Sequence, residues 1–167
     1  MTETQAKGTE ASGVFADRKV KNEPQRALRV FRAGSQQFAV FADEVATIAP
    51  WRRLTPLPEA PPAVLGVVSI QGRMLTVLDP VHLVSDTTGE APCGFIMALR
   101  GDEQLGLAIV DRPEALEVAA GEIIPPDTSN PLVFGIIQRG PENISVLNVR
   151  ELFSTAIRGR ERRRRRF

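Results

Sequence analysis

Residues 64–80 read V-L-G-V-V-S-I-Q-G-R-M-L-T-V-L-D-P and contain the two most apolar runs of the chain. These runs, Val64–Ile70 and Met74–Leu78, flank the step Gln71-Gly72-Arg73. Apolar runs rich in β-branched residues on either side of a Gly-containing step are typical of a β-hairpin, so we expect two largely buried strands. Asp79-Pro80 follows. Asp is a good N-cap and Pro suits the first helical position, so a helical turn is expected to begin there.

The same alternation of short apolar runs and turn residues continues on both sides. Further hairpins are predicted for residues 27–33 with 37–41, 94–99 with 105–110, and 132–138 with 143–147. Residues 43–49 suit a short helical turn or an irregular strand, and residues 115–119 suit a strand. The stretch 50–62 is rich in Pro, which cannot donate to a sheet ladder, so it is expected to be loop or sheet edge. The stretch 121–131 is also rich in Pro and is expected to be irregular.

These patterns predict an all-β fold of two small lobes. Many short strands separated by Gly and Pro turns indicate a barrel or a sandwich. The length of 167 residues fits one domain, or two lobes that share a core. Each half has a hairpin, an irregular apolar stretch and a second hairpin that ends in a helical turn. The last of these turns begins at Asn148-Val149-Arg150-Glu151, which resembles a capping box, and a helix through about residue 157 is expected.

Charge divides the chain into three parts. Residues 1–26 are polar, lack a sustained period and are expected to be a disordered leader. Residues 158–167 carry a charge of +6, which leaves about −6 on residues 27–157. A nucleic-acid-binding barrel is basic on its folded face, so polyanion binding here falls to the tail. That tail is predicted either to contact anionic lipid or nucleic-acid phosphates or to be a solvated terminus; its basic residues are Arg158, Arg160, Arg162, Arg163, Arg164, Arg165 and Arg166.

The residue inventory argues against catalysis and metal binding. A single cysteine, Cys93, and a single histidine, His82, cannot form a disulfide or a thiolate or multi-histidine metal cluster. Phosphate-binding and nucleophile-elbow motifs do not occur. Asp79, His82 and Ser85 suggest a triad by proximity, but a cap and a helical turn explain them better. We therefore predict a protein without enzymatic activity, cofactor or metal. Trp51 is either an interaction anchor or a core residue.

Cellular location is predicted from what the sequence does not contain. The apolar runs are far shorter than the roughly 20 residues that span a bilayer. The first residues lack the pattern of a secretory signal. The chain is accordingly expected to be cytoplasmic.

Several stretches, taken in order, resemble the CheW-like family of chemotaxis coupling domains. Residues 64–80 resemble its signature, in which an apolar run and Gly lead to N-L-R-G and then to an apolar strand that ends in Asp-Leu. Residues 38–48 resemble the opening strand and its V-x-E-I turn. Leu105-Gly106-Leu107-Ala108-Ile109-Val110-Asp111 is similar to the v-G-l-x-V-D strand. Residues 133–153 match the last hairpin and helix. Together these stretches cover residues 28–153, most of the predicted folded region.

The resemblance implies a fold and a function. The fold is two intertwined SH3-like five-stranded β-barrel lobes with a hydrophobic groove between them and a short C-terminal helix. The function is that of a non-catalytic adaptor, which couples a chemoreceptor or other sensor tip to the regulatory domain of a CheA-type histidine kinase in a membrane-associated array. By this resemblance residues 27–157 form the domain. The alternative is a small barrel that binds nucleic acid or anionic membrane through the tail.

Site residues carry over by position. The residues that fall at the family's receptor groove are Val45, Thr47, Gly66, Val68, Ser69, Ile70, Gln71 and Gly72. Thr47 stands where the family has Glu, and Gln71 where it has Arg, so both members of that charged pair are neutral. Losing one member alone leaves an unpaired charge, whereas losing both is compatible with a sound fold. We therefore predict a divergent member that takes its input from a sensor other than an ordinary chemoreceptor.

Overall fold

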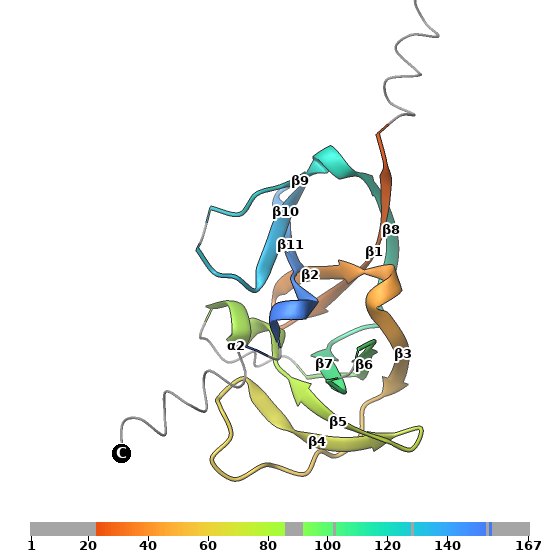
Figure 1. Ribbon diagram of the computed structural model, residues 1–167, viewed down its shortest axis with the longest axis vertical. Helices are drawn as coiled ribbons and strands as arrows, with labels where there is room; N and C mark the ends of the chain where they lie inside the picture. The colour runs from red at the N-terminus through yellow and green to blue at the C-terminus, as the bar shows by residue number, and fades with distance from the viewer. Residues whose placement is uncertain (1–22, 86–91, 102, 128, 153, 155–167) are drawn as a thin grey trace, which may run out of the picture.

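Two β-sheets build the molecule, and the computed structural model describes them over residues 23–85, 92–101, 103–127, 129–152 and 154 (Figure 1). The first sheet has the strand order β8-β1-β2-β11-β10-β9 and the second the order β3-β6-β7-β5-β4. The first sheet contains β1 (Gln25–Ala33), β2 (Gln36–Phe41), β8 (Glu114–Ala119), β9 (Ile123–Ile124), β10 (Val133–Arg139) and β11 (Glu142–Leu147). The second contains β3 (Val45–Pro50), β4 (Val64–Ile70), β5 (Arg73–Leu78), β6 (Phe95–Leu99) and β7 (Leu105–Ile109).

The two sheets exchange segments of the chain. The first hairpin, β1–β2, joins the sheet made by the last strands, because β2 runs parallel to β11. All strands from β3 to β7 lie in the other sheet, where β5 runs parallel to β7. The predicted all-β, intertwined two-lobed fold is confirmed. The first sheet also gains a sixth strand, the two-residue β9, inside a Pro-rich stretch that was expected to be irregular.

All four predicted hairpins form, and two of them share an irregularity. In β4–β5 the register shifts between Val64 and Gly66, and in β10–β11 it shifts between Val133 and Gly135. A Cβ on Gly66 would lie 2.6 Å from the Thr55 carbonyl oxygen, and one on Gly135 would lie 2.9 Å from the Ile124 oxygen. Each glycine thus lets a neighbouring segment approach one hairpin strand closely. This agreement supports the predicted echo between the two halves.

Helical turns follow both of these hairpins. Helix α2 (Pro80–Ser85) starts after Asp79, whose carboxylate oxygen Oδ1 accepts a hydrogen bond of 3.0 Å from the Val81 N–H. This confirms the cap expected from Asp-Pro. After β11, residues 149–152 are helical, and the Glu151 N–H donates to the Asn148 carbonyl at 3.1 Å. The expected end of this helix near residue 157 lies outside the described residues.

Short 3-10 turns link strands in each half of the chain. Turn η1 (Ala42–Glu44) leads into β3, so both interpretations of residues 43–49, helical turn and strand, hold for parts of it. Turn η2 (Ala120–Glu122) leads into β9 in the same way. Strand β1 begins at Gln25, two residues before the predicted boundary of the leader.

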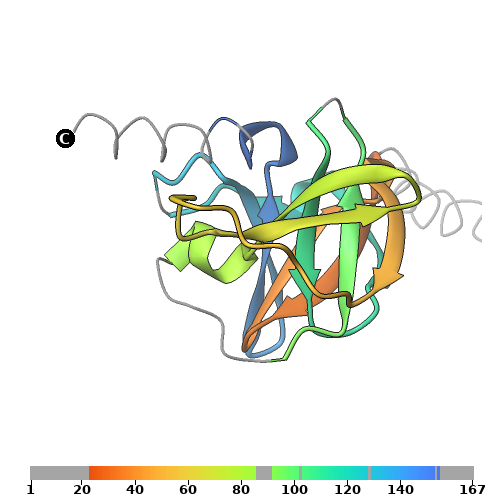
Figure 2. The same cartoon turned by 90° about the horizontal axis from the view of Figure 1, so that it is seen from below.

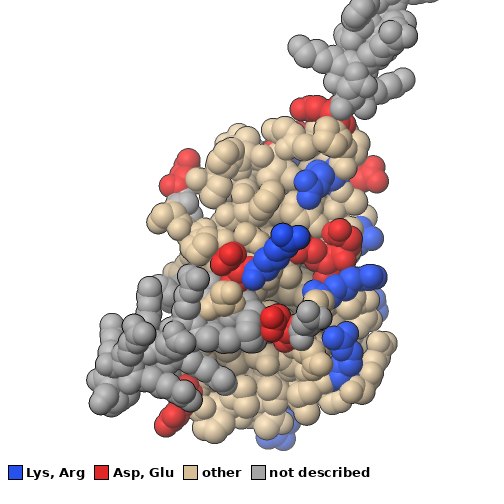
Figure 3. Space-filling view, in the orientation of Figure 1, with Lys and Arg blue, Asp and Glu red and all other residues tan. Residues whose placement is uncertain are grey.

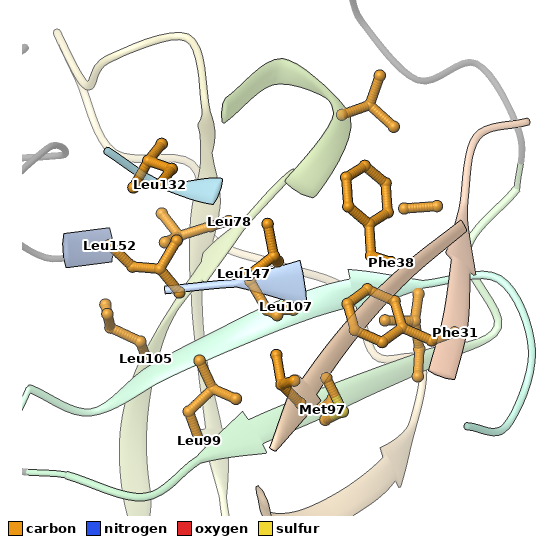
Figure 4. Close-up of a cluster of buried hydrophobic side chains, with 14 residues drawn as sticks. Phe31, Phe38, Leu78, Met97, Leu99, Leu105, Leu107, Leu132, Leu147 and Leu152 are labelled. Carbon is orange, nitrogen blue, oxygen red and sulfur yellow. The ribbon is translucent and has the colours of Figure 1, made fainter. Parts of the chain in front are cut away.

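A shared hydrophobic core joins the sheets. Figure 4 shows side chains from both sheets and from the terminal helical turn converging in it, among them Phe38 of β2, Met97 of β6 and Leu152. Two smaller clusters fill the sheets themselves, one around Val77 and Ile96 and the other around Leu28 and Val146. Figure 2 shows from below how the second sheet, β3-β6-β7-β5-β4, curls on itself. Burial of apolar area in all three clusters is the main stabilising contribution.

Candidate functional site

The predicted groove residues lie on β3, on β4 and on the turn between β4 and β5. Strands β3 and β4 are opposite edges of the five-stranded sheet, but the segment after β3 crosses to β4. Thr55 and Val67 exchange two backbone hydrogen bonds of 2.9 Å each. Because the sheet curls, both Figure 1 and Figure 2 place the tip of the β4–β5 hairpin beside β3. Residues far apart in the sheet order therefore share one end of this lobe.

The side chains of these residues divide by burial. Val68 and Ile70 are 8% and 3% exposed and pack in the core of the five-stranded sheet, so they support this surface from inside. Gly66 is also buried. The residues that reach the surface are Ser69, Gln71 and Gly72, which are exposed, and Val45 and Thr47, which are half-buried.

The turn itself has an unusual backbone. Gln71 and Gly72 have φ angles of 52° and 77°, the two left-handed conformations that a type I′ hairpin turn requires. Gly adopts this conformation readily, whereas Gln adopts it at some cost in strain. The neutral Gln71 side chain is thereby held at the exposed tip.

Two arginine side chains donate hydrogen bonds to the backbone of this surface. The Arg52 side chain donates through Nη1 to the Ser69 carbonyl at 3.1 Å. The Arg100 side chain donates through Nε to the Val45 carbonyl at 3.0 Å. Neither contact was foreseen, because each joins residues distant in the sequence. Both place a cation against the backbone of a predicted site residue.

Two large hydrophobic side chains near this hairpin are exposed, and the predicted groove residues included neither of them. Met74 is 57% exposed and lies opposite Ser69 in the hairpin register. Trp51, which the sequence left as anchor or core, is 38% exposed. Strand alternation was the available signal for Met74, since its neighbour Leu75 is buried and adjacent strand residues face opposite sides. We call Trp51, Ser69, Met74 and the Gln71–Gly72 turn the hairpin face.

A second exposed apolar group lies on the six-stranded sheet. Ile124 and Phe134 are 38% and 47% exposed. The Phe134 ring meets the Phe41 ring edge-on at 5.4 Å, and the Arg26 guanidinium lies 4.2 Å above the Phe41 ring centroid. These aromatic residues line a pocket of about 440 Å³ together with Arg26, Asp43, Glu44, Asn148, Val149 and Arg150. We call Phe41, Ile124 and Phe134 the aromatic face.

Glu44 lines both that pocket and a neighbouring one. The second pocket, of about 350 Å³, also contains Glu44 together with Arg100 and Arg150. Burial raises the pKa of the Glu44 carboxyl above its ordinary value of 4.5, and Asp43 adds to the effect, while a hydrogen bond from the backbone of Phe41 and the charges of Arg150 and Arg26 oppose it. The carboxylate is thus only partly compensated by the cations around it.

The polar residues that suggested a triad lie on α2 or cap it. Asp79 is 8% exposed and caps α2, and the Ser85 hydroxyl donates to the Val81 carbonyl at 2.9 Å. Burial, and secondarily the Asp79 charge, raises the pKa of the Cys93 thiol, which is opposite to the shift that activates a nucleophile. Across the part of the chain that the structure describes, no three His, Cys, Asp or Glu side chains gather into a group able to hold a metal ion.

One further observation concerns membranes. Of the helices in the described ranges, none combines the length and the apolar character needed to cross a bilayer.

Two curled, intertwined sheets with exposed hydrophobic faces define a small β-barrel interaction module. The model of the CheW-like domain family matches residues 28–156, so the chain belongs to this family. It is accordingly a non-catalytic scaffold of chemotaxis signalling, which confirms the predicted family, adaptor class and lack of enzymatic activity.

Individual proteins agree with this assignment. The chain is 43% identical to the chemotaxis protein CheW of Rhizobium meliloti over 54 residues, which is 32% of this chain and 35% of that one. It is 27% identical to the protein FrzA of Myxococcus xanthus over 143 residues, which is 80% of this chain and 88% of that one. The crystal structure of the scaffolding protein TtCheW from Thermoanaerobacter tengcongensis superposes with a TM-score of 0.68 at 19% identity, covering 79% of this chain and 90% of that chain.

Proposed function

We propose that this chain is a two-partner adaptor, which joins a sensor to the regulatory domain of a CheA-type histidine kinase in a cytoplasmic array at the membrane. The main support is the distribution of exposed hydrophobic side chains. Among the described residues, the large ones are Trp51, Met74, Ile124 and Phe134. Met74 lies on β5 and Trp51 directly follows β3 of the five-stranded sheet, whereas Ile124 and Phe134 lie on β9 and β10 of the other sheet. Single exposed apolar residues are ordinary, but grouped ones mark interaction sites.

The two faces are far enough apart to serve two partners at once. In Figure 1, β4 and β5 lie at the lower end of the longest axis and β9 lies at the upper end. A scaffold that holds two proteins together needs surfaces that do not overlap. We assign the sensor to the hairpin face, because the family's receptor groove maps there by position, and the kinase domain to the aromatic face.

The experiment that tests this proposal is a pair of titrations with the full chain. The kinase regulatory domain and the sensor cytoplasmic domain from the same organism are titrated in a calorimeter against wild type, Phe134→Ser and Met74→Ser. Truncating a central anchor side chain commonly costs more than about 1 kcal/mol of binding. We therefore expect Phe134→Ser to weaken kinase binding about tenfold and to spare sensor binding, with the reverse for Met74→Ser.

Both substitutions remove exposed side chains, so they also act as controls for each other. Changes at such positions usually alter stability by no more than about 0.5 kcal/mol, which thermal unfolding checks. No kinase binding by the folded wild-type chain would refute the adaptor proposal. Kinase binding weakened only by Met74→Ser would refute the assignment of faces.

A further part of the proposal is that the input is divergent. Thr47 is half-buried on β3, and Gln71 is exposed at the hairpin tip, so this face lacks the charged pair of the family at both positions. A sensor that depends on that pair loses its contact here. The neutral residues at these two positions support this part of the proposal.

A further inference from the structure

Strand β3 contains a bulge within the predicted groove. Val45 lies opposite Leu99 of β6. Thr47, two residues further on, lies opposite Ala98, which is only one residue back along β6. Ala46 is therefore an extra residue in the ladder, and it is exposed. Bulges bend a strand and turn its side chains, and they are over-represented beside functional sites.

The bulge decides which side of the sheet each of these side chains faces. In a regular strand, residues two apart share a side and residues three apart do not. Here Val45 and Ile48, three apart, both pack against the core that the two sheets share. Thr47 lies opposite Ala98, which packs in the core of the five-stranded sheet, so Thr47 is directed to the other side. Without the bulge, Val45 and Thr47 would face the same way.

Arg100 holds the two carbonyls that precede the extra residue. It follows β6 directly, and its backbone N–H donates to the Glu44 carbonyl at 2.8 Å. Its side chain returns to the same segment, where Nε donates to the Val45 carbonyl at 3.0 Å. A bulge interrupts the ladder of backbone hydrogen bonds, and Arg100 supplies a side-chain donor at that interruption. A single residue thus binds the η1–β3 segment through both its backbone and its side chain.

The surroundings of Arg100 favour this local role over attraction of a charged ligand. The pocket beside it is lined by Glu44 and Glu103 as well as by Arg150, so charges of both signs are present. Figure 3 shows acidic and basic side chains interspersed across the middle of the visible face, so this face carries no extended patch of one sign. None of the ion pairs among the described residues includes Arg100.

We propose that Arg100 is a positioning residue for the sensor site, because it holds the β3 bulge and thereby sets which side chains of β3 reach the partner. This inference deepens the proposed function, on which it rests for the sensor as the partner of this end of the lobe. Arg100 acts through the hydrogen bond that Nε donates, and its charge is dispensable for this role.

Two substitutions separate the hydrogen bond from the charge. In Arg100→Gln the side-chain amide nitrogen stands the same number of bonds from Cα as Nε does, so a neutral donor is kept. Arg100→Met has a chain of similar length without a donor. The cytoplasmic domain of the sensor from the same organism is titrated in a calorimeter against the full chain with each change. We expect Arg100→Met to weaken sensor binding about tenfold and Arg100→Gln to stay within about twofold of wild type.

A second readout follows the bulge itself. Hydrogen–deuterium exchange is measured on residues 42–50, with residues 73–85 as the internal reference. Arg100→Met is expected to raise exchange several-fold in the first segment only, and Arg100→Gln to leave both segments as in wild type. Arg32→Met removes an arginine from an exposed ion pair on β1. It is the matched control and should change neither exchange nor binding.

The two readouts also separate this inference from the adaptor proposal. Equal loss of sensor binding in Arg100→Gln and Arg100→Met would assign the effect to the charge and overturn the inference. Unchanged sensor binding or unchanged exchange in Arg100→Met would overturn it as well. So would an equal loss of sensor and kinase binding, which indicates a general loss of folding. If wild type binds neither domain while the exchange pattern is as expected, the adaptor proposal fails and the role of Arg100 in holding β3 stands.

Discussion

Substituting Gly66 by Ala tests how the segment after β3 is held against β4. Gly66 has a φ angle of +154°, which L side chains rarely adopt, and an added Cβ would lie 2.6 Å from the Thr55 carbonyl oxygen and 3.1 Å from the Leu54 Cβ. The closest atom is backbone, so relief requires the whole segment to move. That movement breaks the two hydrogen bonds between Thr55 and Val67.

The size of the effect follows from these two contributions. A residue forced into a Gly-only backbone region costs about 1–3 kcal/mol. Each lost backbone hydrogen bond costs about 0.5–1.5 kcal/mol. We therefore expect Gly66→Ala to lower the free energy of unfolding by about 4 kcal/mol, which for a chain of this length lowers Tm by roughly 10 °C.

Gly72→Ala is the matched control. Gly72 has a φ angle of +77°, but an added Cβ would meet no atom within 4 Å, so only the conformational cost of about 1–2 kcal/mol applies. Urea unfolding, followed by far-UV circular dichroism and Trp51 emission, measures both variants. If Gly66→Ala destabilises the protein no more than Gly72→Ala does, the close approach of Thr55 is not what requires glycine at position 66.

Three further predictions address the cap, the half-buried acid and the divergent site, and a fourth addresses the tail. Asp79→Ala should lower the free energy of unfolding by about 1–2 kcal/mol in chemical denaturation, because a helix cap is lost. Burial raises the pKa of Glu44, so the ionised carboxylate destabilises the folded state. This loss of stability appears as the pH rises from 4.5 through the higher pKa of the folded state. Glu44→Gln should therefore raise the free energy of unfolding at pH 7 but not at pH 4. Thr47→Glu with Gln71→Arg should leave the Tm nearly unchanged and strengthen binding to a standard chemoreceptor, and no gain would contradict our explanation of the divergence. Removing residues 158–167 should abolish any salt-sensitive binding to nucleic acid or anionic vesicles while leaving kinase binding intact.

The hairpins were predictable because their signals are local. In residues 64–78 the apolar runs, the Gly-containing turn and the following Asp-Pro act within a few residues of one another, and each forms as expected. Strand β9 was missed because Ile123 and Ile124 lie among prolines and are too few to show a period. Their pairing with Ile136 and Ile137 of β10 makes them a strand, and that contact is not encoded nearby.

The candidate site was predictable in position but not in composition. The resemblance placed it at β3 and the β4–β5 turn, yet it did not separate Ile70, which is buried, from Ser69, which is exposed. Nor did it indicate that Arg52 reaches Ser69. Side-chain contacts between distant residues follow from the curl of the sheet, which depends on the pairing of all its strands.

The sequence by itself determined the four hairpins with their turns, the cap at Asp79, the absence of metal-binding clusters of cysteine or histidine, and the family. It could do so because alternation, turn residues and capping act through neighbouring backbone groups. Only the tertiary structure decided that β1–β2 joins the sheet of the last strands, that Trp51 and Met74 are exposed, and that Ile124 and Phe134 are exposed on strands of the other sheet. Those features arise from long-range strand pairing and shared burial, in which each residue's exposure depends on segments far away in the chain.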